Sequence, residues 1–381
     1  MNVAGTYTNF GTLVSNRTVT FNGNANQNIV GNSFHNVVFS GDGIKSLNNA
    51  TGTIFNGSVS INAVTVSGSV FDYVVKGNWT NTGIFISAGT VVFQNTQAQT
   101  ISGGQFYNIV YKDSGTKTLT APLIIQNIFA IETTATVIGG NFTHTVGGNW
   151  INNGNFVTTT STKVKFNSSN QQNISGKFSN IEFTGSGTKM ANSALTILGS
   201  IIIDSNTIFN GGNFTHTIGE SWYNYGTYNA NNGTVQFTKN DTALFVGNTS
   251  LNNIIINIGT FLKVASSDTI FINGTLIENG YLIGAISKTE NISLASTDYE
   301  FGNIGAVISF SGVAVPGNTK VVRITGKTPP GFEDGDALTR FYSISSFQPP
   351  ASGATLTLKY DEDLDIPTEQ IESSLKLWKG N

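Results

Sequence analysis

The chain has no cysteine among its 381 residues, and charged side chains make up only 11% of it. Without cysteine, neither a disulfide framework nor a thiolate metal site can form. The net charge of −3 provides no clustered basic face, so we expect no nucleic-acid partner. No apolar run approaches the roughly 18 residues that a transmembrane helix needs, so we expect no membrane insertion.

Proline is also scarce, with seven residues, whereas glycine contributes 43. The sequence is rich in Asn, Thr and Ser, and its apolar residues are largely β-branched or aromatic. β-Branched and aromatic residues favour strands, and Asn-Gly pairs favour tight turns. This composition predicts an all-β protein with almost no helix. At this length, an elongated repeat array with a smaller second domain is the expected organisation.

A four-residue pattern ending in Phe recurs at intervals of 71 to 73 residues (93 − 21, 166 − 93 and 237 − 166). Two further markers keep the same register. One begins at Phe34, Phe106, Phe178 and Leu251, and the other contains Trp79, Trp150 and Trp222. Short alternating segments between Asn/Gly turns put one set of side chains on an interior face. Repeats of this kind predict a parallel β-solenoid, whose coils hydrogen-bond to their neighbours.

We divide the repeats into a partial unit at 1–17, full units at 18–89, 90–162 and 163–233, and a shortened unit at 234–291. The distance from Trp222 to Leu276 is 18 residues shorter than the 72-residue period (72 − 54), which is about one solenoid coil. We therefore expect three coils of about 24 residues in each full unit, with four of about 18 as the alternative. An antiparallel sandwich array remains the structural alternative, because Asn-Gly also forms hairpins.

The chain opens in the middle of a repeat, and residues 1–6 lack the basic and apolar regions of a signal peptide. Either the protein is intracellular or this is a mature or excised fragment, and we favour a fragment.

Around residue 292 the composition changes. Residues 292–381 hold six of the seven prolines and 11 of the 22 acidic residues. Alternating segments predict strands at 306–310, 320–325, 339–345, 354–360 and 375–378. We expect a small antiparallel, sandwich-like β domain that caps the solenoid, because an open solenoid edge would template aggregation.

Repeat segments of this chain resemble those of large secreted surface proteins of Bacteroidetes: Gly77–Gly83, Gly89–Phe93, Gln99–Gly103 and Phe106–Val110. Segments of the C-terminal part are similar to a β domain often found after such repeats: Thr339–Ile344, Ala354–Tyr360 and Leu375–Trp378. The resemblance covers nearly the whole chain. It implies export by the type IX secretion machinery, an extracellular or cell-surface location and an adhesin-like role, and it identifies no catalytic residue.

The tryptophans Trp79, Trp150 and Trp222 are the candidate ligand-binding residues, because one ring per repeat could form a ladder that stacks sugars. Packing in the interior is the interpretation we favour. Tyr7 and Leu276 occupy the same slot in other units, and leucine can fill a core but cannot stack a sugar.

Two further groups are candidates for polar chemistry. Asp361, Asp363 and Asp365 alternate in the densest acidic run and could bind Ca²⁺, although a solvated turn is favoured and we expect no other cofactor. His144 and His216 lie in matching Asn-Phe-Thr-His-Thr segments, where we expect surface or turn positions.

Two functions remain open. The first is a non-enzymatic structural or adhesin-like protein, a surface stalk that binds glycans or other surfaces through many weak contacts. The alternative is a β-helix carbohydrate-active enzyme, either a polysaccharide lyase or a hydrolase. Glycoside hydrolysis needs paired carboxylates, and the 11 acidic residues of 1–291 are spread singly. We therefore expect no catalytic residue.

Overall fold

The computed structural model describes residues 1–11, 13, 16–293, 298–310, 315–348, 354–368 and 370–377. The described residues are predominantly β-strands and turns, and their only helix is the 3-10 turn η1 (Glu372–Ser374). None of their helices is long and apolar enough to cross a membrane. The chain divides into two compact units, Met1–Phe209 and Asn210–Asn381.

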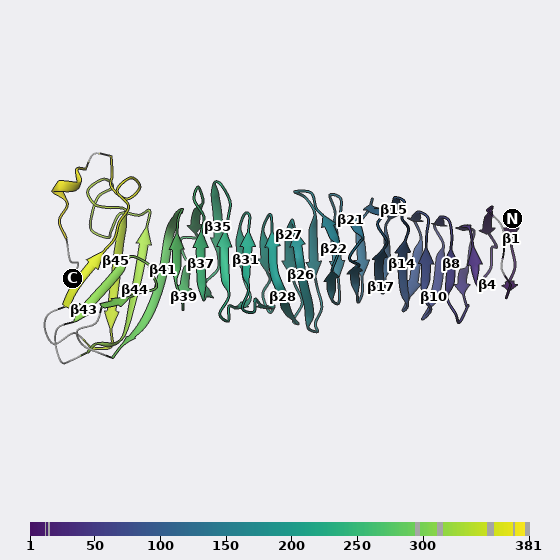
Figure 1. Ribbon diagram of the computed structural model, residues 1–381, viewed down its shortest axis with the longest axis horizontal. Helices are drawn as coiled ribbons and strands as arrows, with labels where there is room; N and C mark the ends of the chain where they lie inside the picture. Colours follow the sequence, from purple (N-terminus) through teal and green to yellow (C-terminus); the bar gives the residue numbers. More distant parts are fainter. Residues whose placement is uncertain are drawn as a thin grey trace. The chain divides into compact units, whose positions relative to one another are not determined.

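In unit 1 the chain passes through three sides in rotation, and its strands lie side by side in sequence order (Figure 1). The first side is sheet A: β1 (Asn2–Val3), β3 (Thr18–Phe21), β6 (Asn36–Phe39), β9 (Val59–Ile61), β12 (Trp79–Asn81), β15 (Gln99–Ser102), β18 (Thr116–Leu119), β21 (Thr136–Ile138) and β24 (Asn155–Val157).

The second side begins as sheet B and continues as sheet D. Sheet B contains β2 (Tyr7–Asn9), β4 (Gln27–Gly31), β7 (Ile44–Leu47), β10 (Thr65–Ser69) and β13 (Ile84–Ser87). In unit 1, sheet D contains β16 (Gly104–Phe106), β19 (Leu123–Ile125), β22 (Thr143–Val146), β25 (Lys163–Phe166), β27 (Asn180–Phe183) and β29 (Ile201–Ile203). Because β13 and β16 belong to different sheets, this side has a break between them.

The third side is sheet C: β5 (Ser33–Phe34), β8 (Thr53–Phe55), β11 (Tyr73–Val75), β14 (Thr90–Gln94), β17 (Asn108–Lys112), β20 (Phe129–Ile131), β23 (Trp150–Asn152), β26 (Gln172–Phe178) and β28 (Thr188–Ile197). Neighbouring strands pair in parallel on all three sides, as between β3 and β6, β4 and β7, and β14 and β17. The predicted parallel β-solenoid is therefore confirmed.

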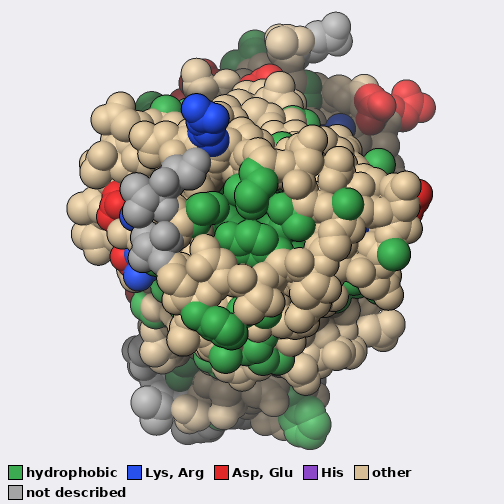
Figure 2. All heavy atoms as spheres, turned by 90° about the vertical axis from the view of Figure 1, so that its right-hand side faces the viewer, with side chains coloured by type: hydrophobic (Ala, Val, Ile, Leu, Met, Phe, Trp, Pro, Cys, Tyr) green, Lys and Arg blue, Asp and Glu red, His purple; other side chains and the backbone are tan. Residues whose placement is uncertain are grey.

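The interior is built by alternation along each strand. In β3 the side chains of Val19 and Phe21 are buried while their neighbours face outward. Phe21 stacks on Phe39 of the next coil at a centroid distance of 5.7 Å, and Phe93 stacks on Tyr111 at 5.8 Å. Burying one such side chain contributes about 1.5–3 kcal/mol. Figure 2 looks onto the amino-terminal end of unit 1, where hydrophobic side chains gather at the centre of the coil.

The length of a coil differs from the prediction. Phe21 pairs with Phe39 and Trp79 pairs with Ile101, so a coil takes 18 residues in one place and 22 in another (39 − 21 and 101 − 79). The Phe marker moves from β3 to β14 and then to β25, which is 11 strands per repeat (14 − 3 and 25 − 14). With three strands to a coil, a repeat spans three and two-thirds coils. The predicted three coils of about 24 residues, and the alternative of four of about 18, are both wrong.

The marker that begins at Phe34, Phe106, Phe178 and Leu251 has an asparagine at its third position, and this asparagine recurs for a structural reason. Its side-chain oxygen accepts a hydrogen bond from a backbone N–H of the next coil. The bonds run from Ser58 to Asn36 (2.8 Å), from Ile128 to Asn108 (3.1 Å), from Ser200 to Asn180 (3.1 Å) and, in unit 2, from Thr275 to Asn253 (3.0 Å). Each asparagine therefore ties one corner to the following coil.

Unit 2 begins with parallel strands. Those of sheet C are β31 (Thr215–Ile218), β34 (Thr234–Phe237), β37 (Asn253–Ile256) and β40 (Leu276–Glu278). Those of sheet D are β32 (Trp222–Asn224), β35 (Thr242–Val246), β38 (Phe261–Val264) and the start of β41 (Tyr281–Ile292). Sheet E contains β36 (Thr249–Leu251) and β39 (Thr269–Ile272). Two further strands are β30 (Ile208–Asn210) and β33 (Thr227–Asn229), which pair with each other.

Strand β41 joins the parallel and antiparallel parts of unit 2. It pairs in parallel with β38 and β39, and along 284–292 it pairs antiparallel with β44 (Gly317–Thr325). Strand β45 (Arg340–Ser346) follows β44, and a separate antiparallel sheet contains β42 (Asp298–Glu300), β43 (Ala306–Phe310) and β46 (Ala354–Leu358). The predicted boundary at 291/292 falls at the end of β41, so sheet E continues through it.

The turn between β42 and β43 contacts β40, the last strand of sheet C. The backbone N–H of Leu276 in β40 donates to the carbonyl of Gly302 at 2.8 Å. Phe301 and Ile304 beside it are fully buried. Four predicted C-terminal strands overlap β43 to β46, whereas 375–377 are not a strand and Trp378 lies outside the described residues. The role of this segment as a cap stays a prediction.

Candidate functional site

The three tryptophans lie in the interior and do not form a sugar-binding ladder. Trp79, Trp150 and Trp222 are 2%, 1% and 0% exposed. Trp150 stacks on Phe129 with ring centroids 4.0 Å apart. Within unit 1, Trp79 lies in sheet A and Trp150 in sheet C, because a repeat does not span whole coils. The interpretation as core residues is therefore the one that the structure supports, and no ring face is open to a ligand.

The acidic run does not bring its carboxylates together around a cation. Asp365 is 0% exposed, and its Oδ2 lies 2.7 Å from Nε of Arg340. The hydroxyl of Tyr281 donates to its Oδ1. Asp361 instead accepts backbone N–H bonds from Asp363 and Leu364 within its own turn. The described residues contain no group of three or more acidic or histidine side chains placed for a metal, and Asp365 is buried rather than solvated.

The two histidines are buried, so their predicted surface positions are wrong. His144 in β22 and His216 in β31 are each 1% exposed. Their Nε2 atoms lie 2.7 Å from the carbonyls of Gly139 and Gly211, five residues earlier. The first repeat has Tyr73 in this slot, and its hydroxyl donates to Gly68 in the same way at 2.6 Å. The slot therefore requires a ring with a hydrogen-bond donor at its tip.

Burial lowers the pKa of both histidines, and the hydrogen bond to a backbone carbonyl only partly opposes it. At His144 the backbone N–H of Leu123 also donates to Nδ1 at 3.2 Å, which leaves no room for a second proton. The folded state thus holds neutral imidazoles, with the proton of His144 on Nε2.

We expect these histidines to weaken the fold at acidic pH. Their pKa in the folded state is below the ordinary value of about 6.5, so the unfolded chain takes up protons first as the pH falls. Their stabilising contribution is full above about pH 6.5 and is lost progressively below it. In urea titrations at pH 7.5 and 5.5, a His144→Tyr/His216→Tyr variant should lose less stability than the unaltered chain. An equal loss in both proteins would contradict this assignment.

Two further sets of repeated polar residues are buried and were missed by the sequence analysis. Gln27, Gln99 and Gln172 each donate through Nε2 to two carbonyls of the preceding coil. The amino groups of Lys45, Lys117 and Lys189, all 0% exposed, also donate to backbone carbonyls. Burial lowers the pKa of the three lysines, to about 8 for Lys189. The recurrence of identical residues at intervals of 72 and 73 is the feature of the sequence that could have identified these two sets.

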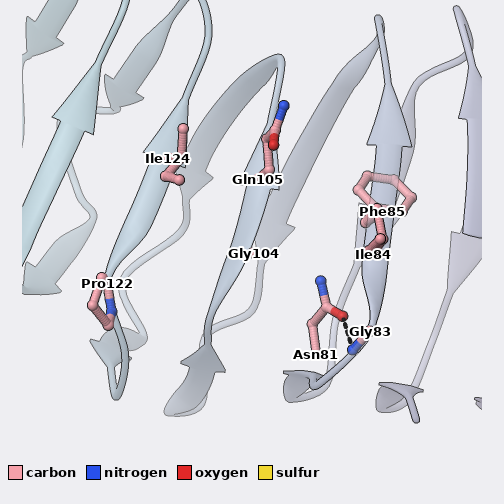
Figure 3. A pocket seen from close by; sticks show the side chains of 8 residues that line it. All are labelled: Asn81, Gly83, Ile84, Phe85, Gly104, Gln105, Pro122 and Ile124. Carbon is pink, nitrogen blue, oxygen red and sulfur yellow. Dashed lines mark hydrogen bonds between the residues drawn. The ribbon is translucent and has the colours of Figure 1, made fainter. Parts of the chain in front are cut away.

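The break in the second side of unit 1 forms a shallow groove of about 270 Å³ (Figure 3). We call it the sheet-break groove, and its lining residues are Asn81, Gly83, Ile84, Phe85, Gly104, Gln105, Pro122 and Ile124. Ile84 and Ile124 are 57% and 51% exposed. Figure 3 shows Gln105 and Ile124 on the neighbouring strands β16 and β19, with Ile84 across the groove on β13.

Position 104, in the lining of the groove, requires glycine. Gly104 has a φ of +136°, and a Cβ there would lie 3.0 Å from the ring of Phe106. At the lower rim, Oδ1 of Asn81 accepts the N–H of Gly83 at 2.9 Å, which fixes the amide in place. None of the eight lining residues is charged. Apolar walls with amide edges favour a neutral ligand that offers both a hydrophobic face and hydroxyl groups.

The architecture defines the class of the protein as a parallel β-solenoid followed by antiparallel strands. No protein-family profile, no curated protein and no solved structure matches this chain. Fold alone does not determine function, so the candidate function depends on the surface features described above.

Proposed function

We propose that this chain is a non-enzymatic extracellular protein with a structural, adhesin-like role, and that its sheet-break groove contacts neutral glycans or other surfaces. The observation that carries the proposal is the shortness of the connections between strands. From β3 to β41, where every residue is described, no connection between consecutive strands exceeds five residues. Catalytic residues lie disproportionately on loops held by a rigid scaffold, and connections of five residues or fewer are too short to wall a deep cleft.

The charged groups of the solenoid also favour this proposal over a glycoside hydrolase. Such an enzyme needs a carboxylic acid whose pKa is raised, so that it can protonate the leaving group. Burial raises the pKa of Glu182, but Lys165 and Lys163 outweigh this effect and hold it below its ordinary value. Both lysines lie within 3.0 Å of its carboxylate, so Glu182 is an ion-pair partner and not a general acid.

The proposal is tested by a glycan array on which both binding and turnover of the full chain are measured. We expect binding without release of new reducing ends. An Ile84→Ser variant should bind about five- to tenfold more weakly, because it loses an apolar contact of about 1–1.5 kcal/mol. The matched control is Ile258→Ser, which changes an isoleucine that is 84% exposed and distant in sequence from the groove.

Two outcomes would contradict the proposal. Specific turnover of any glycan would show an enzyme. Equal binding by the Ile84→Ser and Ile258→Ser variants would remove the groove as the contact surface. Export by the type IX machinery, which the resemblance implies, belongs to the same proposal and is tested separately by following the protein into the medium of a secreting host.

A further inference from the structure

A second cavity, of about 340 Å³, lies within unit 2 between β40 and the antiparallel strands. This volume falls in the range of small-molecule sites, roughly 300–1,000 Å³. One wall is formed by the last parallel strand, where Ile277 is 46% exposed. Three cationic side chains line the cavity from the other parts: Arg323 of β44, Arg340 of β45 and Lys359, which follows β46.

The carboxylates near the cavity are already fully engaged. Glu278 forms a two-point ion pair with Arg323, at 2.6 and 2.9 Å, and also accepts the backbone N–H of Leu282 at 2.8 Å. Asp365, behind Arg340, forms an ion pair with that guanidinium and accepts hydrogen bonds from the hydroxyl of Tyr281 and from the N–H of Asp361. Neither carboxylate therefore has capacity left to neutralise another cation.

The cavity keeps one positive charge in excess, since three cations face two carboxylates. Lys359 is exposed and forms no ion pair with any described residue. Arg323 is 1% exposed, and its Nε has no hydrogen-bond partner among the described residues. The side-chain amides of Asn279 and Asn303 complete the lining. A single excess charge favours a monoanion, and amides beside an exposed isoleucine suit the hydroxyls and C–H groups of a sugar.

We propose that this cavity binds a carboxylate-bearing monosaccharide unit, a uronic acid. Lys359 and Arg340 hold the carboxylate, Asn279 and Asn303 meet hydroxyl groups, and Ile277 contacts C–H groups of the sugar without stacking on it. This site is separate from the sheet-break groove, which has no charged lining residue, and its ligand is acidic where the groove favours a neutral one. The two proposals therefore stand or fall independently.

The test is calorimetric titration of the full chain with D-glucuronate, with D-glucose and sodium sulfate as comparison ligands. We expect saturable binding of glucuronate that weakens as the salt concentration rises, and no comparable binding of glucose. A Lys359→Gln variant should bind glucuronate about tenfold more weakly, because one charge-assisted hydrogen bond is lost. The control, Lys263→Gln, changes another exposed lysine of unit 2 and should stay within about twofold.

Several results would overturn the proposal. The absence of saturable glucuronate binding, or an equal effect of the two lysine substitutions, would exclude this cavity as the site. Sulfate binding as tight as glucuronate binding would reduce it to a general anion site without selectivity for a sugar. Because Lys359 is exposed, we expect unchanged thermal unfolding of Lys359→Gln, which separates lost binding from lost structure.

Discussion

A Trp150→Ala variant unfolds with a free energy about 3–5 kcal/mol below that of the unaltered chain, as expected when a large aromatic side chain is removed from a packed core. Trp150 is 1% exposed and stacks on Phe129 with an interplanar angle of 3°. Phe156 and Phe178 contact it from other directions, at centroid distances of 4.9 and 5.2 Å. The neighbouring rings are held by their own strands, so they cannot collapse into the space left behind.

The measurement is guanidinium denaturation followed by far-UV circular dichroism. Ile151→Ala is the matched control, because this next residue of β23 points outward and is 40% exposed; its effect should stay near about 1 kcal/mol or less. Trp150→Phe should cost less than Trp150→Ala, since it keeps the stacked ring and removes an indole N–H that has no partner among the described residues. If Trp150→Ala and Ile151→Ala have the same effect, the ring is not a core residue.

The second large effect concerns the buried ion pair of unit 2. We expect Arg340→Met to destabilise the protein by about 3–5 kcal/mol, because it leaves the carboxylate of Asp365 buried without its cation. The side chains of Arg340 and Asp365 are only 7% and 0% exposed. The remaining donors, the Tyr281 hydroxyl and the Asp361 N–H, do not supply a positive charge.

A double substitution distinguishes the loss of the Arg340–Asp365 ion pair from the cost of leaving one buried charge unpaired. Arg340→Met/Asp365→Leu should recover most of the stability lost by Arg340→Met, because no unpaired buried charge remains. Lys112→Met breaks the exposed pair with Glu132, whose side chains are 37% and 49% exposed, and should cost less than about 1 kcal/mol. Urea denaturation of all three variants checks this order. A double variant as unstable as the single one would contradict it.

The solenoid could be predicted because its signal is periodic and local. Alternation in segments such as Thr18–Phe21 follows directly from the strand period of two residues, and the recurring Phe and Asn markers fix the repeat. The number of coils could not be read in this way. A coil is complete when the chain has passed through three strands and returned to the same side. A sequence repeat can end after any strand, so its length does not give the number of coils.

The recurrence of the buried polar residues can be seen in the sequence, but their burial could not be predicted from it, for a different reason. Lysine is almost never fully buried unless it is paired, so Lys45 and Lys117 favour the surface when the sequence is read alone. Each donates to a carbonyl 22 residues earlier (45 − 23 and 117 − 95). That partner lies on the preceding coil and can be identified only once the length of a coil is known. The cavity of unit 2 could not be predicted for the same reason, since its lining residues Arg323 and Glu278 are 45 residues apart in sequence.

The mismatch between repeat and coil has a consequence for how such a chain can change in length. Within unit 1 the same Phe marker occurs in sheet A at Phe21, in sheet C at Phe93 and in sheet D at Phe166. A duplication or loss of one repeat would therefore rotate everything downstream by two-thirds of a turn. Three successive duplications would restore the original orientation, so the number of repeats sets which way a downstream surface faces as well as how far away it is carried.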